Sequence, residues 1–353
     1  MRDFSRARYA AAQGARVAWY MGQYLLARRM SGPFDRPGDP KFKPQAREGD
    51  PARIRASFLD LFAKDRANIE AGLYPAPNEV RVESALSALR NSARFFRDLP
   101  SVDARRLQRD GTEVREAARN GESDAEGRYP TYYLQNFHYQ TGGWLSRESA
   151  KLYDTQVEIL FGGAADAMRR IALGSLARAL KGRDQRQVKL LDLACGNGRF
   201  LRQILAAFPR IPATGLDLSP AYCAEARTRL AAWPQVDIVT GAVEQAPFES
   251  ESFKAATCVY LFHELPPRIR RDAVREIARV LKPGGVLVFA DSIQSGDASD
   301  LARMLEYFPV GFHEPYFGSY LSEDLHALFG EVGLAHEETE LAFLTKVMRF
   351  RKV

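Results

Sequence analysis

The chain has 353 residues, of which 46% are hydrophobic and 27% charged, with a formal net charge of +6. These fractions are typical of a soluble globular protein with a sizeable core, and the modest positive charge selects no particular kind of partner. Three cysteines, none of them at CxxC spacing, argue against a disulfide framework and against a zinc site. No apolar run approaches the ~18 residues of a membrane-spanning helix, and the N-terminus lacks a secretory signal pattern, so we expect a cytoplasmic protein.

The N-terminal segment is predicted to form a helix over residues 4–30. Apolar and aromatic residues recur there at helical spacing, between several arginines. Such a helix suits packing against its own protein or a dimer partner, since cores also use aromatic stripes. A basic amphipathic helix also suits peripheral contact with an anionic membrane, so both interpretations stay open.

The remainder of the N-terminal third is predicted to be helical, with one irregular segment. Residues 31–51 are crowded with proline, glycine and charge, which favours a linker or a surface crossing. Helices are expected over these ranges: roughly 52–72, from after Asn78 as far as Pro100, and 102–119. The polar stretch 120–128 favours a boundary, so residues 1–125 form the predicted helical region.

Short apolar runs alternate with helical segments from residue 189 onward. Strands are expected at 188–194, 213–218, 236–241, 255–262, 286–291, 335–342 and 343–351. Helices are expected between them, including one from Pro267 to Leu281 and one near 322–332. This alternation predicts an α/β, doubly wound, Rossmann-like sheet of seven strands, with the final strand as an antiparallel edge. We expect this domain to cover residues 126–353, with its core at 186–353 and an aromatic-rich segment at 129–150 before it.

The first strand runs into a glycine-rich turn in the sequence LDLACGNGRF, residues 191–200. Glycines at 196 and 198 let the backbone bend sharply and let a ligand approach the main chain. Ligands of open α/β sheets bind beyond the carboxyl ends of strands, and Asp192 lies at such an end. The spacing fits neither the phosphate-binding loop nor the dinucleotide-binding fingerprint.

The second strand ends at an acidic residue in the sequence TGLDLSP, residues 214–220. Asp217 comes about 20 residues after the glycine turn, where a carboxylate accepts hydrogen bonds from ribose hydroxyls in dinucleotide-binding folds. Alternatively, the carboxylate caps the helix that begins near Ser219. The preceding glycine turn favours ribose binding.

Two further segments complete a resemblance to class I S-adenosylmethionine-dependent methyltransferases, closest in style to those of quinone biosynthesis and small-molecule methylation. They are GAVEQAPFESESFKAATCVYLFHELP and RVLKPGGVLVFAD, and the resembling stretch covers roughly residues 150–353. The resemblance implies S-adenosylmethionine as the cofactor. It also implies that the cofactor contacts come from Tyr153, Asp192, Ala194, Gly196, Gly198, Asp217, Leu218, Val243, Glu244 and Tyr260.

The chain departs from the family pattern at two cofactor positions. Ala194 replaces the first glycine of the turn, which requires a negative φ at that residue. Ala242 replaces an acidic residue that often meets the adenine. The backbone near Val243, with Glu244 close by, is therefore expected to serve instead.

Groups that act on the methyl acceptor are expected after the fourth strand and in two aromatic-rich segments, 129–146 and 308–320. The candidate catalytic residues are His263, Glu264 and His313, because a histidine with a pKa near 7 suits removal of a proton. Substrate contacts are expected from Tyr139, Glu314, Tyr316 and Tyr320. A packing role is the alternative for these residues. His138, His263 and His313 lack metal-ligand spacing, so no metal is expected.

The predicted reaction is methyl transfer to O, N or C of a small molecule of hydrophobic or aromatic character. A nucleic-acid or protein methyltransferase is one alternative. No nucleic-acid partner is expected, because no Asp/Asn-Pro-Pro-Phe/Tyr motif follows the fourth strand. The other alternative is a non-catalytic protein that binds S-adenosylmethionine or supports an assembly, because a fold does not fix a function.

Overall fold

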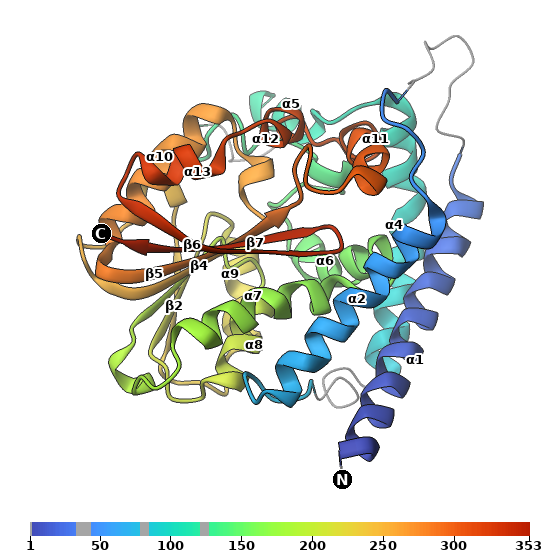
Figure 1. Cartoon of the computed structure of the whole chain (residues 1–353). Helices are drawn as coiled ribbons and strands as arrows, with labels where there is room; N and C mark the ends of the chain where they lie inside the picture. Colours follow the sequence, from blue (N-terminus) through green and yellow to red (C-terminus); the bar gives the residue numbers. More distant parts are fainter. Residues whose placement is uncertain (1, 33–43, 78–84, 121–126) are drawn as a thin grey trace. The chain divides into compact units, whose positions relative to one another are not determined.

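The computed structural model describes residues 2–32, 44–77, 85–120 and 127–353 (Figure 1). The chain divides into two compact units. The helical unit comprises Met1–Arg47, Ala76–Asp166 and Glu306–Glu314, and the sheet unit comprises Glu48–Pro75, Ala167–Leu305 and Pro315–Val353. Much of the predicted linker at 31–51 and of the predicted boundary at 120–128 lies outside the described residues. The start of the methyltransferase domain at residue 126 stays a prediction.

The helical unit contains α1 (Arg2–Met30), α4 (Ala85–Gln108), α5 (Glu113–Arg119), η1 (Phe137–Tyr139), α6 (Arg147–Leu160) and, from residue 306, α11 (Ala302–Phe312). The predicted helix over 4–30 is confirmed. One face of α1 packs within the unit, where Tyr20 and Ala27 are buried. Arg16 fixes this face, because its guanidinium lies 2.6 Å from Glu158 and 3.2 Å from Asp166.

The predicted helix end at Pro100 is wrong, because α4 continues through this proline as far as Gln108. A proline inside a helix removes one backbone hydrogen bond and crowds the preceding turn, at a cost of about 3 kcal/mol. Contacts of α4 with α1, α6 and η1 offset that cost. The helix ends where Arg109 takes a positive φ of 53°. The second half of the predicted helix over 102–119 is the separate helix α5.

The sheet unit contains seven strands in the order β3-β2-β1-β4-β5-β7-β6. The strands are β1 (Leu190–Leu193), β2 (Ala213–Asp217), β3 (Val236–Thr240), β4 (Phe253–Val259), β5 (Leu281–Ser292), β6 (Leu334–Ala342) and β7 (Thr345–Lys352). The unit's main helices are α2 (Pro51–Glu70), α7 (Ala165–Ala179), α8 (Arg199–Ala207), α9 (Pro220–Arg229), α10 (Pro267–Val280), α12 (Phe317–Leu321) and α13 (Leu325–Gly330). The predicted doubly wound seven-stranded sheet is confirmed.

The final strand is antiparallel, as predicted, but its predicted edge position is wrong. β7 lies between β5 and β6 and pairs with both. Its apolar side chains Val347, Met348 and Phe350 are fully buried, which suits an interior position.

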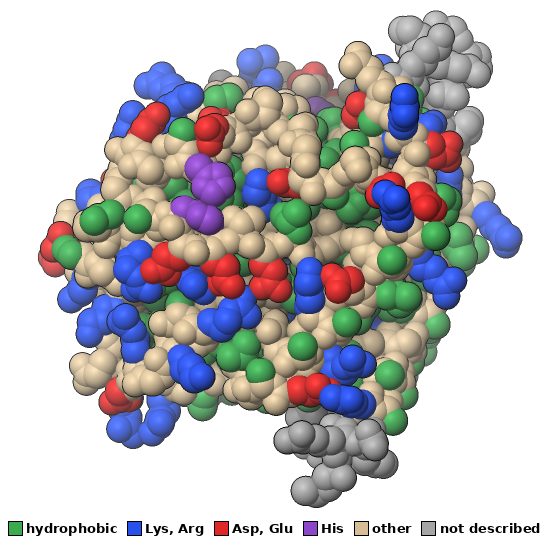
Figure 2. All heavy atoms as spheres, viewed as in Figure 1, with side chains coloured by type: hydrophobic (Ala, Val, Ile, Leu, Met, Phe, Trp, Pro, Cys, Tyr) green, Lys and Arg blue, Asp and Glu red, His purple; other side chains and the backbone are tan. Residues whose placement is uncertain are grey.

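On this side of the sheet the edge strand is β6, and its glutamates form ion pairs. Glu337 binds Arg349 and Arg351, and Glu340 binds Arg178 at 2.7 Å. Figure 2 shows acidic and basic side chains alternating in a band across this face. Charged side chains on an edge strand discourage pairing with another chain.

The sheet order places a topological switch point between β1 and β4. β1 pairs in parallel with β2 on one side and with β4 on the other. The crevice beyond the carboxyl ends of such strands is where ligands bind in open α/β sheets. Among the helices of the described ranges, none is long and apolar enough to cross a membrane.

Candidate functional site

Asp192 is a buried carboxylate at the carboxyl end of β1. The side chain is 2% exposed, and Oδ1 accepts a 2.6 Å hydrogen bond from the Thr257 hydroxyl, on the register partner in β4. Among the residues that the structure describes, no group bonds to Oδ2. Burial, together with repulsion from Asp217, raises the pKa of Asp192 to about 7, although the Thr257 hydrogen bond opposes this shift. A buried acceptor of this kind favours a cationic donor.

The glycine turn after β1 is fastened to the end of β2 through Asp217. The Gly196 amide donates to Oδ2 at 2.8 Å, and the Ser219 amide donates to Oδ1 at 2.9 Å. Burial raises the pKa of Asp217 to about 6, against the lowering effect of these two amides. Gly196 and Gly198 have positive φ values of 55° and 77°, which glycine adopts at little cost. The predicted turn therefore forms beside the predicted ribose-binding carboxylate.

The expectation of a negative φ at Ala194 is wrong. Ala194 has a φ of 53°, in the left-handed region that disfavours residues with a Cβ. The turn keeps the backbone path that a glycine would take at this position. Packing and hydrogen bonds around the turn, including the bond from the Cys195 amide to the Leu216 carbonyl, sustain that path.

His263 and Asp291 form a buried pair beyond the ends of β4 and β5. His263 lies in η4 (Phe262–Glu264), and its Nδ1 is 2.5 Å from Asp291 Oδ1. Asp291 also accepts the Phe262 amide at 2.7 Å and the Ser292 amide at 2.7 Å. The carboxylate therefore fixes both the η4 backbone and the imidazole. When Nδ1 donates to a carboxylate, Nε2 is the nitrogen that accepts a proton.

Comparison with known proteins connects this geometry to a family. Residues 190–285 match the family described as "Methyltransferase domain". Over these residues the chain is therefore similar to a methyltransferase domain.

The curated relatives of this methyltransferase domain include two named enzymes. The demethylmenaquinone methyltransferase of Chlorobaculum tepidum is 33% identical over 164 residues, or 46% of this chain and 63% of that protein. The phthiotriol/phenolphthiotriol dimycocerosates methyltransferase of Mycobacterium leprae is 35% identical over 107 residues, or 29% of this chain and 37% of that protein. The chain therefore spans less than two thirds of the length of these relatives.

A solved structure described as a SAM-dependent methyltransferase from Aquifex aeolicus also aligns with the chain. The identity is 16% and the TM-score 0.40, over 52% of this chain and 89% of that chain. The family match confirms the predicted resemblance, for which S-adenosylmethionine is the expected cofactor.

The buried polar groups of the methyltransferase domain fit this cofactor. The unpartnered Oδ2 of Asp192 suits the ammonium of the methionine moiety. Each oxygen of Asp217 accepts one amide and keeps a lone pair for a ribose hydroxyl. The loop after β3 lies beside the end of β2, because the Gly241 amide donates to the carbonyl of Asp217 at 2.9 Å. This loop carries the predicted adenine neighbours, the buried Val243 and the half-buried Glu244.

Tyr260 directly follows β4 and has a positive φ of 58°. Its amide donates to the Ala290 carbonyl, and its hydroxyl lies 2.6 Å from the Thr345 hydroxyl at the start of β7. Strained backbone of this kind persists where surrounding structure fixes it, often at functional sites. The predicted contact with the cofactor stays a prediction.

Tyr316 and Tyr320 surround Arg270, a fully buried residue of α10 that sequence reasoning missed. The guanidinium donates to the Tyr316 carbonyl and to the Phe262 carbonyl, both at 2.8 Å. Tyr320 is fully buried, and its hydroxyl donates to the Ser292 carbonyl at 2.6 Å. These bonds fit the packing alternative for Tyr320, and its predicted substrate contact stays a prediction.

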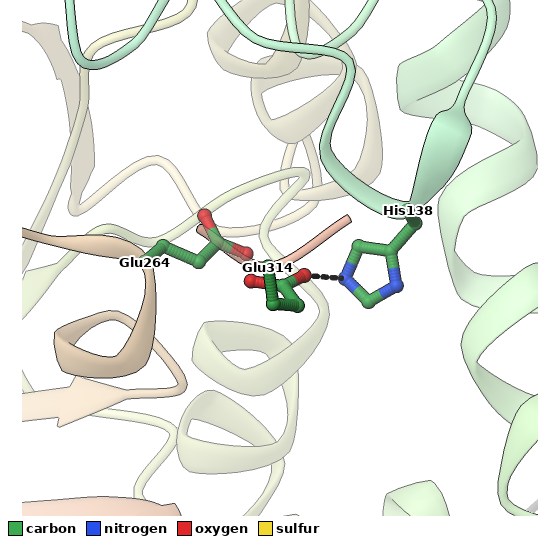
Figure 3. Close-up of side chains that lie close together, drawn as sticks. All are labelled: His138, Glu264 and Glu314. Atoms are coloured by element: carbon green, nitrogen blue, oxygen red, sulfur yellow. Dashed lines mark ion pairs between the residues drawn. The ribbon is translucent and has the colours of Figure 1, made fainter. Parts of the chain in front are cut away.

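Four further predicted residues belong to the helical unit: Tyr139, Tyr153, His313 and Glu314. Figure 3 shows the His138 imidazole facing the buried Glu314 carboxylate, with Nε2 and Oε1 3.1 Å apart. His138 also packs against aromatic rings, with its centroid 5.9 Å from that of Trp144 and 6.2 Å from that of Phe308. The Tyr153 ring lies 5.3 Å from Trp144 in turn. The predicted roles of Glu314 and Tyr153 stay predictions.

His313 packs against Tyr139 in the helical unit, with ring centroids 5.5 Å apart. Burial lowers the pKa of His313, and the Arg115 guanidinium lowers it further. A Cβ added to Gly111 would lie 2.0 Å from the His313 imidazole, so the ring packs directly against the backbone of Gly111. Both effects favour the neutral form of the His313 imidazole, and its predicted catalytic role stays a prediction.

Proposed function

We propose that this protein transfers a methyl group from S-adenosylmethionine to O, N or C of a small molecule of hydrophobic or aromatic character. One observation carries the proposal: two carboxylates, the buried Asp192 and the half-buried Asp217, meet the glycine turn at the switch point of the sheet. Asp192 offers an unpartnered oxygen there, at a place where ligands bind in this kind of fold.

The cofactor is held by the methyltransferase domain in this proposal. Asp192 accepts a hydrogen bond from the methionine ammonium, and Asp217 accepts bonds from the ribose hydroxyls. The turn from Ala194 to Gly198 follows the methionine moiety. Leu218, Val243 and Glu244 border the adenine. A cation beside Asp192 also offsets the cost of burying its charge, which is visible in its raised pKa.

S-adenosylmethionine supplies the methyl group when bound, and the chain's own residues orient the acceptor and take up its proton. His263 suits this proton transfer, because Asp291 accepts from Nδ1 and leaves Nε2 as the basic nitrogen. Glu264 Oε1 lies 3.9 Å from that Nε2. Positioning and proton removal are the two tasks that a displacement at a sulfonium methyl leaves to the protein.

The names of the relatives support a small-molecule acceptor over a nucleic acid or a protein. They are a demethylmenaquinone methyltransferase and a phthiotriol/phenolphthiotriol dimycocerosates methyltransferase. We propose an acceptor of comparable hydrophobic character for this chain. Tyr139, Glu314, Tyr316 and Tyr320 remain the predicted contacts on the acceptor side, and His313 remains a catalytic candidate.

Calorimetric titration of the full chain with S-adenosylmethionine and with S-adenosylhomocysteine tests the cofactor assignment. We expect binding of both, with at least a ten-fold loss in Asp192→Asn and in Asp217→Asn. Asp237→Asn is the matched control, because this exposed carboxylate lies on β3, away from the carboxyl end of the strand. Absence of heat with both ligands in folded protein would refute the proposal.

Transfer of a radiolabelled methyl group to a panel of hydroquinones, phenols and catechols tests the reaction. We expect an acceptor-dependent product that His263→Gln reduces without changing cofactor affinity. Cofactor binding without any such product, across broader acceptor extracts as well, would favour the non-catalytic alternative.

A further inference from the structure

Exposed apolar side chains gather on two helices of the helical unit, α1 and α4. These helices carry seven of the ten large hydrophobic side chains that are exposed in the described part of the chain. The seven are Trp19, Met21, Leu25, Leu26, Met30, Leu86 and Leu89. The two helices contact each other and run side by side in Figure 1. A contiguous exposed apolar surface marks an interaction site more often than scattered single residues do.

Three of these side chains form a stripe along α1. Trp19, Leu26 and Met30 are separated by seven and four residues, which places them on one face of a helix. They are 41%, 48% and 54% exposed. Tyr20 and Ala27, at the next positions along the helix, are buried against the rest of the helical unit. The stripe is therefore a second apolar face of α1, distinct from the face that the fold covers.

Arginines accompany the apolar side chains on both helices. Exposed arginines lie at Arg8, Arg28 and Arg29 of α1 and at Arg90, Arg94 and Arg97 of α4. The acidic side chains described in these helices are engaged elsewhere. Asp98 accepts a hydrogen bond from Thr141 at 2.6 Å, and Asp103 forms an ion pair with Arg106. The described outer surface of α1 and α4 thus combines apolar side chains with positive charge.

We propose that this surface of α1 and α4, which we term the basic apolar face, binds an anionic lipid surface. Helices with arginines beside tryptophan and leucine lie in the interface of a bilayer, with their apolar side chains among the headgroups. Anionic headgroups attract the arginines, and this attraction falls with salt. A second copy of the chain is the less suitable occupant. A symmetric interface would bring two copies of the same positively charged surface together.

Sedimentation of the full chain with lipid vesicles tests the proposal, which does not depend on the proposed methyl transfer. The vesicles contain phosphatidylcholine alone or phosphatidylcholine mixed with phosphatidylglycerol. We expect binding to the mixed vesicles, weaker binding to the neutral ones, and loss of binding at high salt. Each arginine near an anionic surface contributes about five-fold in partition. Exposed Arg8 lies three helical turns before Trp19, on the same side of α1 as the stripe, so Arg8→Gln is expected to lower binding about five-fold.

Replacing the apolar side chains distinguishes their insertion into the bilayer from charge attraction alone. A Trp19→Gln, Leu26→Gln and Met30→Gln variant is expected to lose binding, because its side chains no longer enter the headgroup region. Leu59→Gln is the matched control, since Leu59 is an equally exposed leucine on α2 of the sheet unit. Circular dichroism and calorimetric cofactor binding show that each variant is folded.

Three results would overturn the proposal. The first is no binding to the mixed vesicles, and the second is equal binding to neutral vesicles at high salt. The third is a dimer in analytical ultracentrifugation that the triple variant dissociates, because the basic apolar face would then be covered by a second copy of the chain.

Discussion

Replacing Asp192 by asparagine separates the cost of folding from the benefit of binding the cofactor. Burial raises the pKa of this carboxyl from 3.8 to about 7, with a further contribution from Asp217 and an opposing one from Thr257. A shift of about three units, at 1.36 kcal/mol for each unit, corresponds to about 4 kcal/mol. This is the approximate cost of folding the apo protein with Asp192 ionised. Asparagine keeps an oxygen that accepts the Thr257 hydroxyl and removes the charge.

The direction of the pH dependence follows from the raised pKa of Asp192. Below about pH 4 the carboxyl is protonated in the folded and unfolded chains alike, so it costs nothing. Between about pH 4 and pH 7 the folded chain holds more protons than the unfolded chain, so stability falls as pH rises. Above about pH 7 the full penalty is present. Asp192→Asn avoids that penalty, so its advantage grows with pH.

Urea unfolding at about pH 5 and about pH 8, with calorimetric titration of S-adenosylhomocysteine, measures both effects of Asp192→Asn. We expect the variant to be more stable than the wild type by about 2–4 kcal/mol at the higher pH and by about half as much or less at the lower pH. Its affinity for the ligand is expected to fall at least ten-fold. Asp237→Asn is expected to change stability by less than about 0.5 kcal/mol. A variant that is less stable at the higher pH, or that binds the ligand like the wild type, would refute the reasoning.

Four further substitutions test other features of the fold and of the site. Ala194→Gly relieves a positive φ that costs about 1–2 kcal/mol, but it adds about 0.5–1 kcal/mol of conformational freedom to the unfolded chain. Urea unfolding should therefore show a net gain in stability of up to about 1 kcal/mol. A clear loss of stability would contradict the backbone strain at this position. Asp65→Ala removes the carboxylate that Arg170 binds at 2.6 Å in the buried interior, and thermal unfolding should show a loss of about 3–5 kcal/mol. A loss under about 1 kcal/mol would contradict it. His263→Gln is expected to lower kcat by about 10²–10⁴ at saturating cofactor, and Asp291→Asn to shift the pH profile of kcat, both without weakening cofactor binding. An unchanged kcat in His263→Gln would exclude His263 as the base.

Local sequence signals account for what the sequence predicted well. The helix over Arg2–Met30, the strands of the sheet and the turn at Gly196 each depend on residues close together in the chain. The position of Asp217 beside Gly196 followed from a resemblance over consecutive motifs, and the hydrogen bond between them agrees with it. Periodicity and turn chemistry are strong signals at this range.

Long-range pairing accounts for what the sequence did not predict. Asp291 binds His263 only because β4 and β5 pair in a register that aligns their carboxyl ends, and that register is not visible along the chain. β7 takes an interior place because its backbone pairs with both β5 and β6, whereas its alternating pattern also fits an edge. The helix through Pro100 and the positive φ of Ala194 likewise depend on surrounding contacts that outweigh a local preference.

The interior place of β7 also governs how a nascent chain completes its sheet. Residues 286–292 of β5 find their pairing partners in 345–351, which the ribosome adds about 60 residues later. At 5–20 residues per second, β5 waits roughly 3–12 s with open amide and carbonyl groups along one side. Such an unpaired side is a template for wrong partners, so these seconds of synthesis are when the protein is most prone to aggregate and most in need of a chaperone.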